Sequence, residues 1–109
     1  MDKFYALADP TRRKILEMLA SQGPLPATEI YAQFPASPPA ISQHLKVLRQ
    51  AELVRVEKRA QHRIYQLNPE AMLELGEWAR HLNHLWGQRF EALDELLEQE
   101  KKKSSGSAK

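Results

Sequence analysis

A run of polar side chains between residues 37 and 51 has the chemistry of a surface that reads nucleic acid. If the segment turns by about 100° per residue, as an α-helix does, Ile41, Leu45 and Leu48 share one apolar stripe. The opposite side carries short uncharged or basic side chains, namely Pro39, Ser42, Gln43, Lys46 and Gln50. These groups offer donors and acceptors to base edges and phosphate oxygens. The pattern predicts a helix over 38–51 that packs by one side and enters a DNA major groove by the other.

The charge distribution favours this interpretation over an ordinary amphipathic surface helix. Residues 37–66 carry six Lys or Arg side chains against two Glu, whereas residues 69–100 carry two Arg against eight Asp or Glu. A basic patch attracts the phosphate backbone, and an acidic helix is repelled by it and should face away. The basic side chains that follow the polar helix are Lys58, Arg59, His62 and Arg63. We expect them to contact mostly phosphate, along the backbone or in the minor groove.

The sequence gives little support for a metal site or for thiol chemistry. The chain has no cysteine, which excludes disulfides, thiolate metal sites and thiol redox sensing. Glu77, His81 and His84 share one side of an expected helix and are weak candidates for zinc ligands. A solvated or interfacial pair of histidines is the favoured interpretation, so we expect no metal.

Enzymes and membrane proteins are the next classes to set aside. The sequence contains no glycine-rich phosphate loop, no nucleophile flanked by a base and no carboxylate pair converging on a pocket. We therefore expect a protein that is not an enzyme and needs no cofactor. No apolar run is long enough to cross a bilayer, and residues 1–4 lack the pattern of a signal peptide. The expectation is a cytoplasmic protein with no membrane partner.

Turn and cap signals mark the helices that must position the polar surface. Residues 4–7 form a short apolar turn, and Asp9 followed by proline starts a second helix that stops at Gly23. A third helix is expected over 27–34, and Ser37 caps the polar helix. A short helix, a tight turn and a second helix make a helix-turn-helix.

A change of period after Leu53 predicts a β-hairpin beside that motif. Apolar and charged residues alternate over 54–59, and a second strand follows up to Leu67, with the tip near Ala60-Gln61. We therefore predict a mainly α winged helix-turn-helix of about five helices with a two-stranded antiparallel wing. Residues 1–100 form one domain, and residues 101–109 form a disordered basic tail.

The segment from Pro69 to about Glu100 is expected to be one helix roughly 45 Å long, with more apolar surface than one small domain covers. A second copy of the chain would bury this stripe under two-fold symmetry. The expected dimer interface combines aromatic and leucine side chains from both ends of the chain: Phe4, Tyr5, Leu7, Trp78, Leu82, Leu85, Trp86, Phe90 and Leu93.

Three segments then carry a family resemblance. Residues 6–16 (ALADPTRRKIL), 40–49 (AISQHLKVLR) and 63–67 (RIYQL), in this order, resemble the ArsR-type (arsenical-resistance repressor) winged-helix regulators. The resemblance implies a homodimeric repressor that binds a palindromic operator, with 38–51 as the recognition helix and the first and last helices as the dimer interface. It places Ser37, Ser42, Gln43, His44 and Lys46 where the family contacts DNA, and Arg59, His62 and Arg63 on its wing.

The departures from the family pattern are specific. Metal-sensing members use cysteines in the third helix or an Asp/His set across the last helix, and this sequence reproduces neither arrangement. The chain therefore resembles a cysteine-free branch that does not sense metals. Glu52 stands where a helix-ending glycine is usual in the family, and Ala60-Gln61 stands at a wing tip that often holds glycine, which puts two turn geometries in question.

Two alternatives remain open at this point. A winged helix can serve as a protein-interaction module in which DNA binding is vestigial. Within the DNA-binding class, a small organic effector in the dimer interface would make the protein ligand-responsive. Effector, operator sequence and regulated genes are not encoded in any motif of this sequence.

Overall fold

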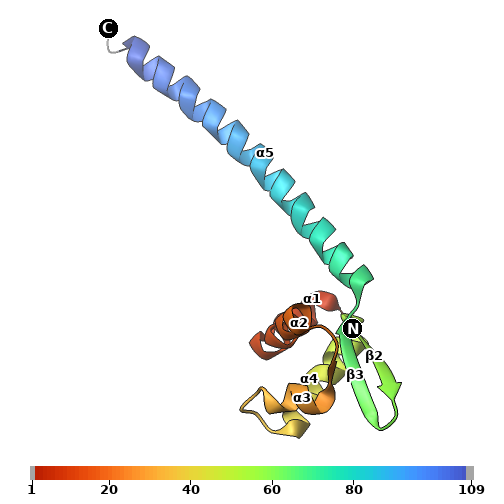
Figure 1. Cartoon of the computed structure of the whole chain (residues 1–109). Helices are drawn as coiled ribbons and strands as arrows, with labels where there is room; N and C mark the ends of the chain where they lie inside the picture. The colour runs from red at the N-terminus through yellow and green to blue at the C-terminus, as the bar shows by residue number, and fades with distance from the viewer. Residues whose placement is uncertain (1, 108–109) are drawn as a thin grey trace. The chain divides into compact units, whose positions relative to one another are not determined.

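The computed structural model describes residues 2–107, with side chains described for residues 2–101. Eight elements follow one another in these residues (Figure 1): α1 (Lys3–Leu7), α2 (Pro10–Gln22), β1 (Leu25–Pro26), α3 (Ala27–Ala32), α4 (Pro38–Gln50), β2 (Val54–Arg59), β3 (His62–Leu67) and α5 (Pro69–Ser107). They fall into two compact units, one ending at Met72 and the other beginning at Leu73.

The helix starts predicted from side-chain caps are confirmed. The Asp9 carboxylate accepts a hydrogen bond from the Arg12 backbone N–H at 3.1 Å, and Pro10 opens α2. The Ser37 hydroxyl accepts from the Ala40 backbone N–H at 3.4 Å at the start of α4. Gly23 ends α2 with a φ of 81°, a conformation that glycine adopts without steric cost.

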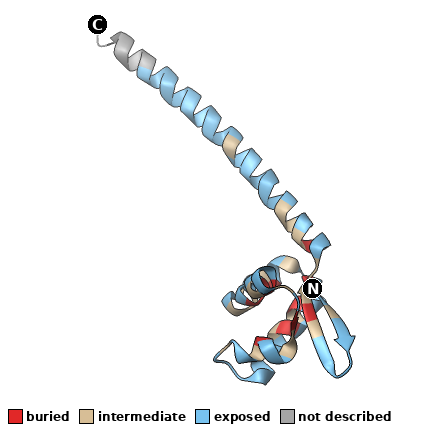
Figure 2. Ribbon diagram, in the orientation of Figure 1, coloured by how far each residue is buried: buried red, intermediate tan, exposed pale blue. Residues whose placement is uncertain are grey.

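Among residues 2–101, the buried residues all belong to the first unit (Figure 2). Ile41 and Leu48 are fully buried and Leu45 is 1% exposed, so the predicted apolar stripe of α4 is confirmed. Ile15, Ile30 and Leu53 are fully buried as well, which brings α2, α3 and the start of the hairpin into the same core as α4. Helix α4 is thus held by apolar packing on its buried side.

The sheet has three strands in the order β1-β3-β2, so the prediction of a two-stranded wing is wrong in the number of strands. The hairpin itself is confirmed, with Arg59 opposite His62 and the tip at 60–61. The added strand β1 pairs Leu25 with Tyr65 and Pro26 with Ile64, both antiparallel. A strand of two residues, one of them a proline, is too short to show an alternation of apolar and polar side chains. It is recognised only by its pairing with β3.

In both turns where the family resemblance implies glycine, a residue other than glycine adopts the left-handed backbone conformation. Glu52 has a φ of 60° and Ala60 a φ of 54°. Glu52 follows the end of α4, where its N–H donates to the Arg49 carbonyl and the N–H of Leu53 donates to the Leu48 carbonyl, both at 3.0 Å. These two bonds are the pattern of a Schellman motif. The turn geometry is retained, at a cost of about 1 kcal/mol per residue relative to glycine.

Three helix ends differ from expectation. Helix α3 ends at Ala32 rather than Phe34, and α4 ends at Gln50 with Ala51 as its C-cap. Helix α5 continues past Glu100 to Ser107, so residues 101–107 of the expected disordered tail are helical, while residues 108–109 lie outside the described residues. Lys101 to Lys103 have high helix propensity and give the helix no reason to stop. No helix in the described part of the chain combines the length and apolarity that a bilayer crossing needs.

Candidate nucleic-acid interface

The side of α4 opposite its buried stripe is exposed. Ser42, Gln43 and Lys46 are all exposed, as are Pro39 and Gln50 at the two ends of the helix. The predicted division of this helix into a packing side and an outward side is therefore confirmed. Because Leu45 and its two apolar neighbours are fixed in the core, the outward side chains project from a rigid element.

A groove of about 290 Å³ lies between α4 and β3. Helix α4 supplies Ser42, Gln43, Lys46 and Arg49, and β3 supplies Arg63 and Tyr65. Three cationic side chains and an amide thus line one concave surface. An arginine can bind guanine and a glutamine can bind adenine through two hydrogen bonds, and a lysine attracts phosphate as a point charge. The groove therefore has the donors and charges that a duplex requires.

Two groove residues were missed at the sequence level. Arg49 lies three residues after Lys46 and seven after Ser42, which is the spacing of neighbours on one helix side. That spacing was available as a signal. Tyr65 is 6% exposed and forms part of the groove wall from within the sheet. Its alternation with Ile64 indicates a strand face, but nothing in the sequence indicates which element that face meets.

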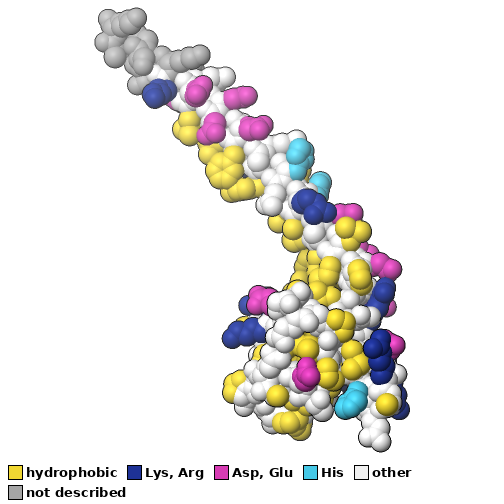
Figure 3. Space-filling model, in the orientation of Figure 1, with side chains coloured by type: hydrophobic (Ala, Val, Ile, Leu, Met, Phe, Trp, Pro, Cys, Tyr) yellow, Lys and Arg dark blue, Asp and Glu magenta, His cyan; other side chains and the backbone are white. Residues whose placement is uncertain are grey.

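The hairpin register divides the predicted wing residues between two faces. Arg63 lies opposite Lys58 and shares its face with Tyr65 and the groove, whereas His62 and Arg59 lie opposite each other on the other face. Arg59 is paired with Glu57, with Nε 3.3 Å from Oε1 and the other guanidinium contact also at 3.3 Å. Basic side chains are visible over the hairpin in Figure 3. The structure thus brings Arg63 to α4 and leaves Arg59 and His62 at the tip.

His44 and Ser37 do not join the groove. The His44 side chain is 25% exposed, and its Nδ1 lies 3.4 Å from Nη1 of Arg12 on α2 and 3.8 Å from Oδ2 of Asp9, the N-cap of that helix. Partial burial raises the pKa of Asp9, but the backbone N–H groups of Arg12 and Thr11 and the electrostatic interactions with the side chains of His44 and Arg12 together hold the pKa of this carboxyl below its ordinary value. Ser37 is exposed and acts as the helix cap described above.

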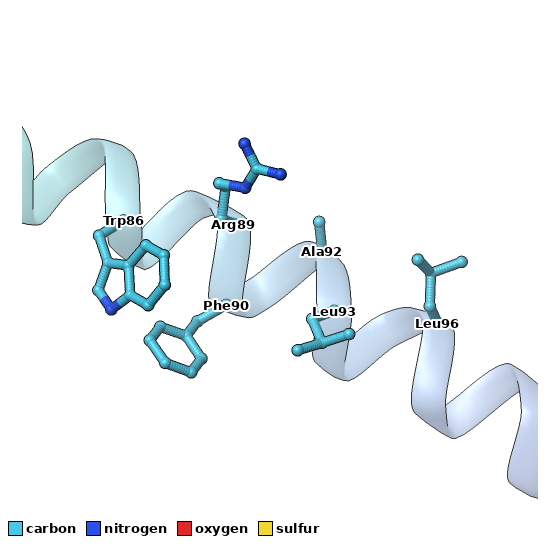
Figure 4. A pocket seen from close by; sticks show the side chains of 6 residues that line it. All are labelled: Trp86, Arg89, Phe90, Ala92, Leu93 and Leu96. Atoms are coloured by element: carbon cyan, nitrogen blue, oxygen red, sulfur yellow. The ribbon is translucent and has the colours of Figure 1, made fainter.

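In the second unit, α5 presents a continuous row of exposed apolar side chains. Trp78, Leu82, Leu85, Trp86, Phe90 and Leu93 are each 45–58% exposed. The rings of Trp86 and Phe90 meet edge to face, with centroids 4.8 Å apart. An apolar pocket beside them is lined by six side chains of α5, shown in Figure 4: Trp86, Arg89, Phe90, Ala92, Leu93 and Leu96. Of these, Arg89, Ala92 and Leu96 were not among the predicted interface residues.

In the first unit, Phe4 is 47% and Tyr5 is 59% exposed, while Leu7 is half-buried. Among residues 2–101, no three His, Cys, Asp or Glu side chains gather in a way that could hold a metal ion. Glu77, His81 and His84 are therefore not gathered into such a group.

Comparison with known proteins gives one consistent result. A family model described as a helix-turn-helix domain matches residues 7–57. The chain is 41% identical to the HTH-type transcriptional regulator Rv2034 of Mycobacterium tuberculosis, over 87% of this chain and 85% of that protein. It is 40% identical to the transcriptional repressor SdpR of Bacillus subtilis, over 69% of this chain and 82% of that protein.

Solved structures agree with the sequence relatives. A structure described as a possible transcriptional regulator for arsenical resistance is 38% identical, with a TM-score of 0.68 over 75% of this chain and 84% of that one. The ArsR-like transcriptional regulator from Rhodococcus sp. RHA1 is 26% identical, with a TM-score of 0.70 over 85% of this chain and 87% of that one.

Proposed function

The chain belongs to the ArsR family of winged helix-turn-helix transcriptional regulators, and on that premise we propose that it is a homodimeric cytoplasmic repressor that reads a palindromic operator with α4. The observation that carries the proposal is the groove between α4 and β3. Ser42 and Gln43 can read base edges there, while Lys46, Arg49 and Arg63 supply the positive charge for the backbone. The protein acts by occupying DNA, with no reaction at the site.

The dimer in this proposal rests on the exposed apolar side chains of α5 and α1. A helix that leaves Trp78, Leu82 and Phe90 about half exposed gains stability when a second copy covers them. A two-fold axis makes each copy cover the same patch of the other, and it presents two α4 helices to DNA in inverted orientation. An inverted pair of half-sites is what a palindromic operator offers.

Selection from a pool of random-sequence duplexes tests the proposal directly. The protein is expected to enrich one inverted-repeat sequence, and its affinity for that sequence should fall steeply as salt rises. If the chain instead served as a protein-interaction module, no sequence would be enriched and duplex binding would be weak at all salt concentrations. Footprinting upstream of the gene that encodes the chain then locates the natural site.

Gln43→Ala is expected to reduce specific DNA affinity by about 1–3 kcal/mol and to spare binding to random duplexes, because side-chain contacts to base edges carry the sequence information. The measurement is a titration of the selected duplex and of a random duplex at one salt concentration. Gln50→Ala is the matched control, since Gln50 is an exposed glutamine of the same helix outside the groove. An equal loss on both duplexes would mean that Gln43 contacts only the backbone.

Arg63→Ala is expected to weaken binding to every duplex and to flatten the plot of log affinity against log salt by roughly one unit, since one phosphate contact is lost. Arg59→Ala removes the same charge from the opposite face of the hairpin, where Glu57 already pairs with it. We expect the smaller change there. The measurement is a titration of duplex DNA with each variant at several salt concentrations. If the slopes of log affinity against log salt were equal for the two variants and the wild type, the hairpin would not contact DNA.

A further inference from the structure

Helix α1 is held to the rest of the first unit by two arginines of α2. A helix of five residues has too few backbone hydrogen bonds to be stable alone. Arg12 donates from Nε to the Ala6 carbonyl at 2.7 Å and from Nη2 to the Tyr5 carbonyl at 3.2 Å. Arg13 donates from Nη1 to the Leu7 carbonyl at 2.7 Å. Both arginines therefore satisfy carbonyls at the C-terminal end of α1, where positive charge is favoured.

Arg12 differs from Arg13 because its guanidinium also reaches the recognition helix. Its Nη1 lies 3.4 Å from Nδ1 of His44 on α4, and its planar group stands 5.5 Å from the centre of the Tyr5 ring on α1. The Arg12 backbone N–H is in turn bonded to Asp9, whose Oδ2 lies 3.8 Å from the same His44 nitrogen. One side chain thus joins α1, α2 and α4.

The contact on α4 lies beside the groove. His44 directly follows Gln43 and is half-buried, so its ring faces α2 while Gln43 faces outward. Fixing the ring of His44 opposes rotation of α4 about its own axis, and such a rotation would move Gln43 relative to a base edge. A shift of a few tenths of an ångström is enough to weaken a two-bond contact.

We propose that Arg12 is a positioning residue for DNA reading, which ties α1 to the recognition helix through His44. The proposal rests on the DNA-binding function proposed above. In this proposal, Arg12 holds His44 in place, and His44 affects DNA binding through this contact rather than by touching DNA. Because Tyr5 belongs to the proposed dimer surface, the state of α1 in the dimer becomes coupled to the orientation of Gln43.

Arg12→Lys tests the proposal because lysine keeps the charge but has no planar fork to bond two carbonyls and His44 at once. The probe is the duplex selected by the wild-type protein, compared with a random duplex. We expect about tenfold weaker binding to the selected duplex, the scale of one lost charge-assisted hydrogen bond, with random-duplex affinity and salt slope unchanged. Arg13→Lys is the matched control, since Arg13 anchors α1 at the same 2.7 Å without the His44 contact.

A double-mutant cycle with His44→Ala decides between a direct and an indirect role for His44. If His44 acts through Arg12, the double variant binds the selected duplex no more weakly than the weaker single variant. Additive losses would show that His44 contacts DNA by itself and would overturn the proposal. Equal losses for Arg12→Lys and Arg13→Lys would overturn it as well, because α1 anchoring alone would then explain both. Circular dichroism and thermal unfolding of every variant check that the fold is retained.

The same experiment separates this proposal from the one it rests on. If the wild-type protein enriches no sequence from the random pool, DNA reading itself is refuted. If it enriches a sequence that Arg12→Lys binds as tightly as the wild type does, only the role of Arg12 is refuted.

Discussion

Leu82→Glu is expected to dissociate the proposed homodimer and to abolish tight operator binding at micromolar protein concentration. Leu82 lies in the middle of the exposed row on α5 and is 50% exposed in the single chain. In a dimer its replacement would bury an unpaired carboxylate, which costs several kcal/mol. Sedimentation and operator titration on the same samples give the measurement. The loss in DNA affinity follows because a monomer holds only one half-site.

His84→Glu provides the control for charge alone. Two residues further along the helix, His84 projects about 160° away from Leu82, and it is exposed. It adds the same carboxylate to the other side of α5, so this variant should remain dimeric and bind its operator normally. A Leu82→Glu protein that also remains dimeric would place the dimer interface on another element. Loss of the dimer in both variants would mean that the net charge of α5 decides association.

Leu45→Ala is expected to lower the free energy of unfolding of the first unit by about 2–5 kcal/mol, because truncating a buried leucine leaves a cavity that the surroundings fill only in part. Leu45 is 1% exposed and anchors α4 from the side opposite the groove. For a domain of this size the loss is a large fraction of the total stability. Urea unfolding followed by circular dichroism at constant protein concentration measures it, and a loss below about 1 kcal/mol would show that α4 is held mainly by other contacts.

Lys46→Ala separates packing from DNA contact on the same helix. Lys46 is exposed and lines the groove, and alanine is the better helix former. Stability should therefore change by less than about 0.5 kcal/mol, while affinity for every duplex falls. The two neighbouring substitutions thus have opposite signatures: Leu45→Ala changes stability, and Lys46→Ala changes binding.

Local signals predicted most of the fold. Two helix starts are marked by a capping residue followed by proline, Asp9-Pro10 and Ser37-Pro38. In each, the side-chain oxygen accepts a hydrogen bond from a backbone N–H three residues later, so the signal lies entirely in neighbouring residues. The buried stripe of α4 follows from helix periodicity in the same way. Strand β1 was missed because its pairing with Tyr65 is a contact between residues forty positions apart along the chain.

The candidate site was predicted only in part, because local signals again place residues on a helix side but do not show which distant elements they meet. Helix geometry alone places Ser42, Gln43 and Lys46 outward, and they line the groove. His44 occupies a position that the family pattern assigns to DNA, but its direction depends on where α2 packs against α4, which no local pattern encodes. The sequence could in principle have placed Arg59 and Arg63 on opposite faces of the hairpin. Successive side chains of a strand alternate between its two faces, and the hairpin register relates one strand to the other.

The distribution of aromatic residues gives each compact unit its own optical signal. The chain has two tryptophans, Trp78 and Trp86, and both lie in the exposed row of α5. Its three tyrosines, at positions 5, 31 and 65, all lie in the first unit. Tryptophan emission therefore reports what covers α5, and its shift to shorter wavelength on concentrating the protein would follow association without any label. Tyrosine absorbance reports unfolding of the first unit, so the two units can be followed separately by two ultraviolet signals in one unlabelled sample.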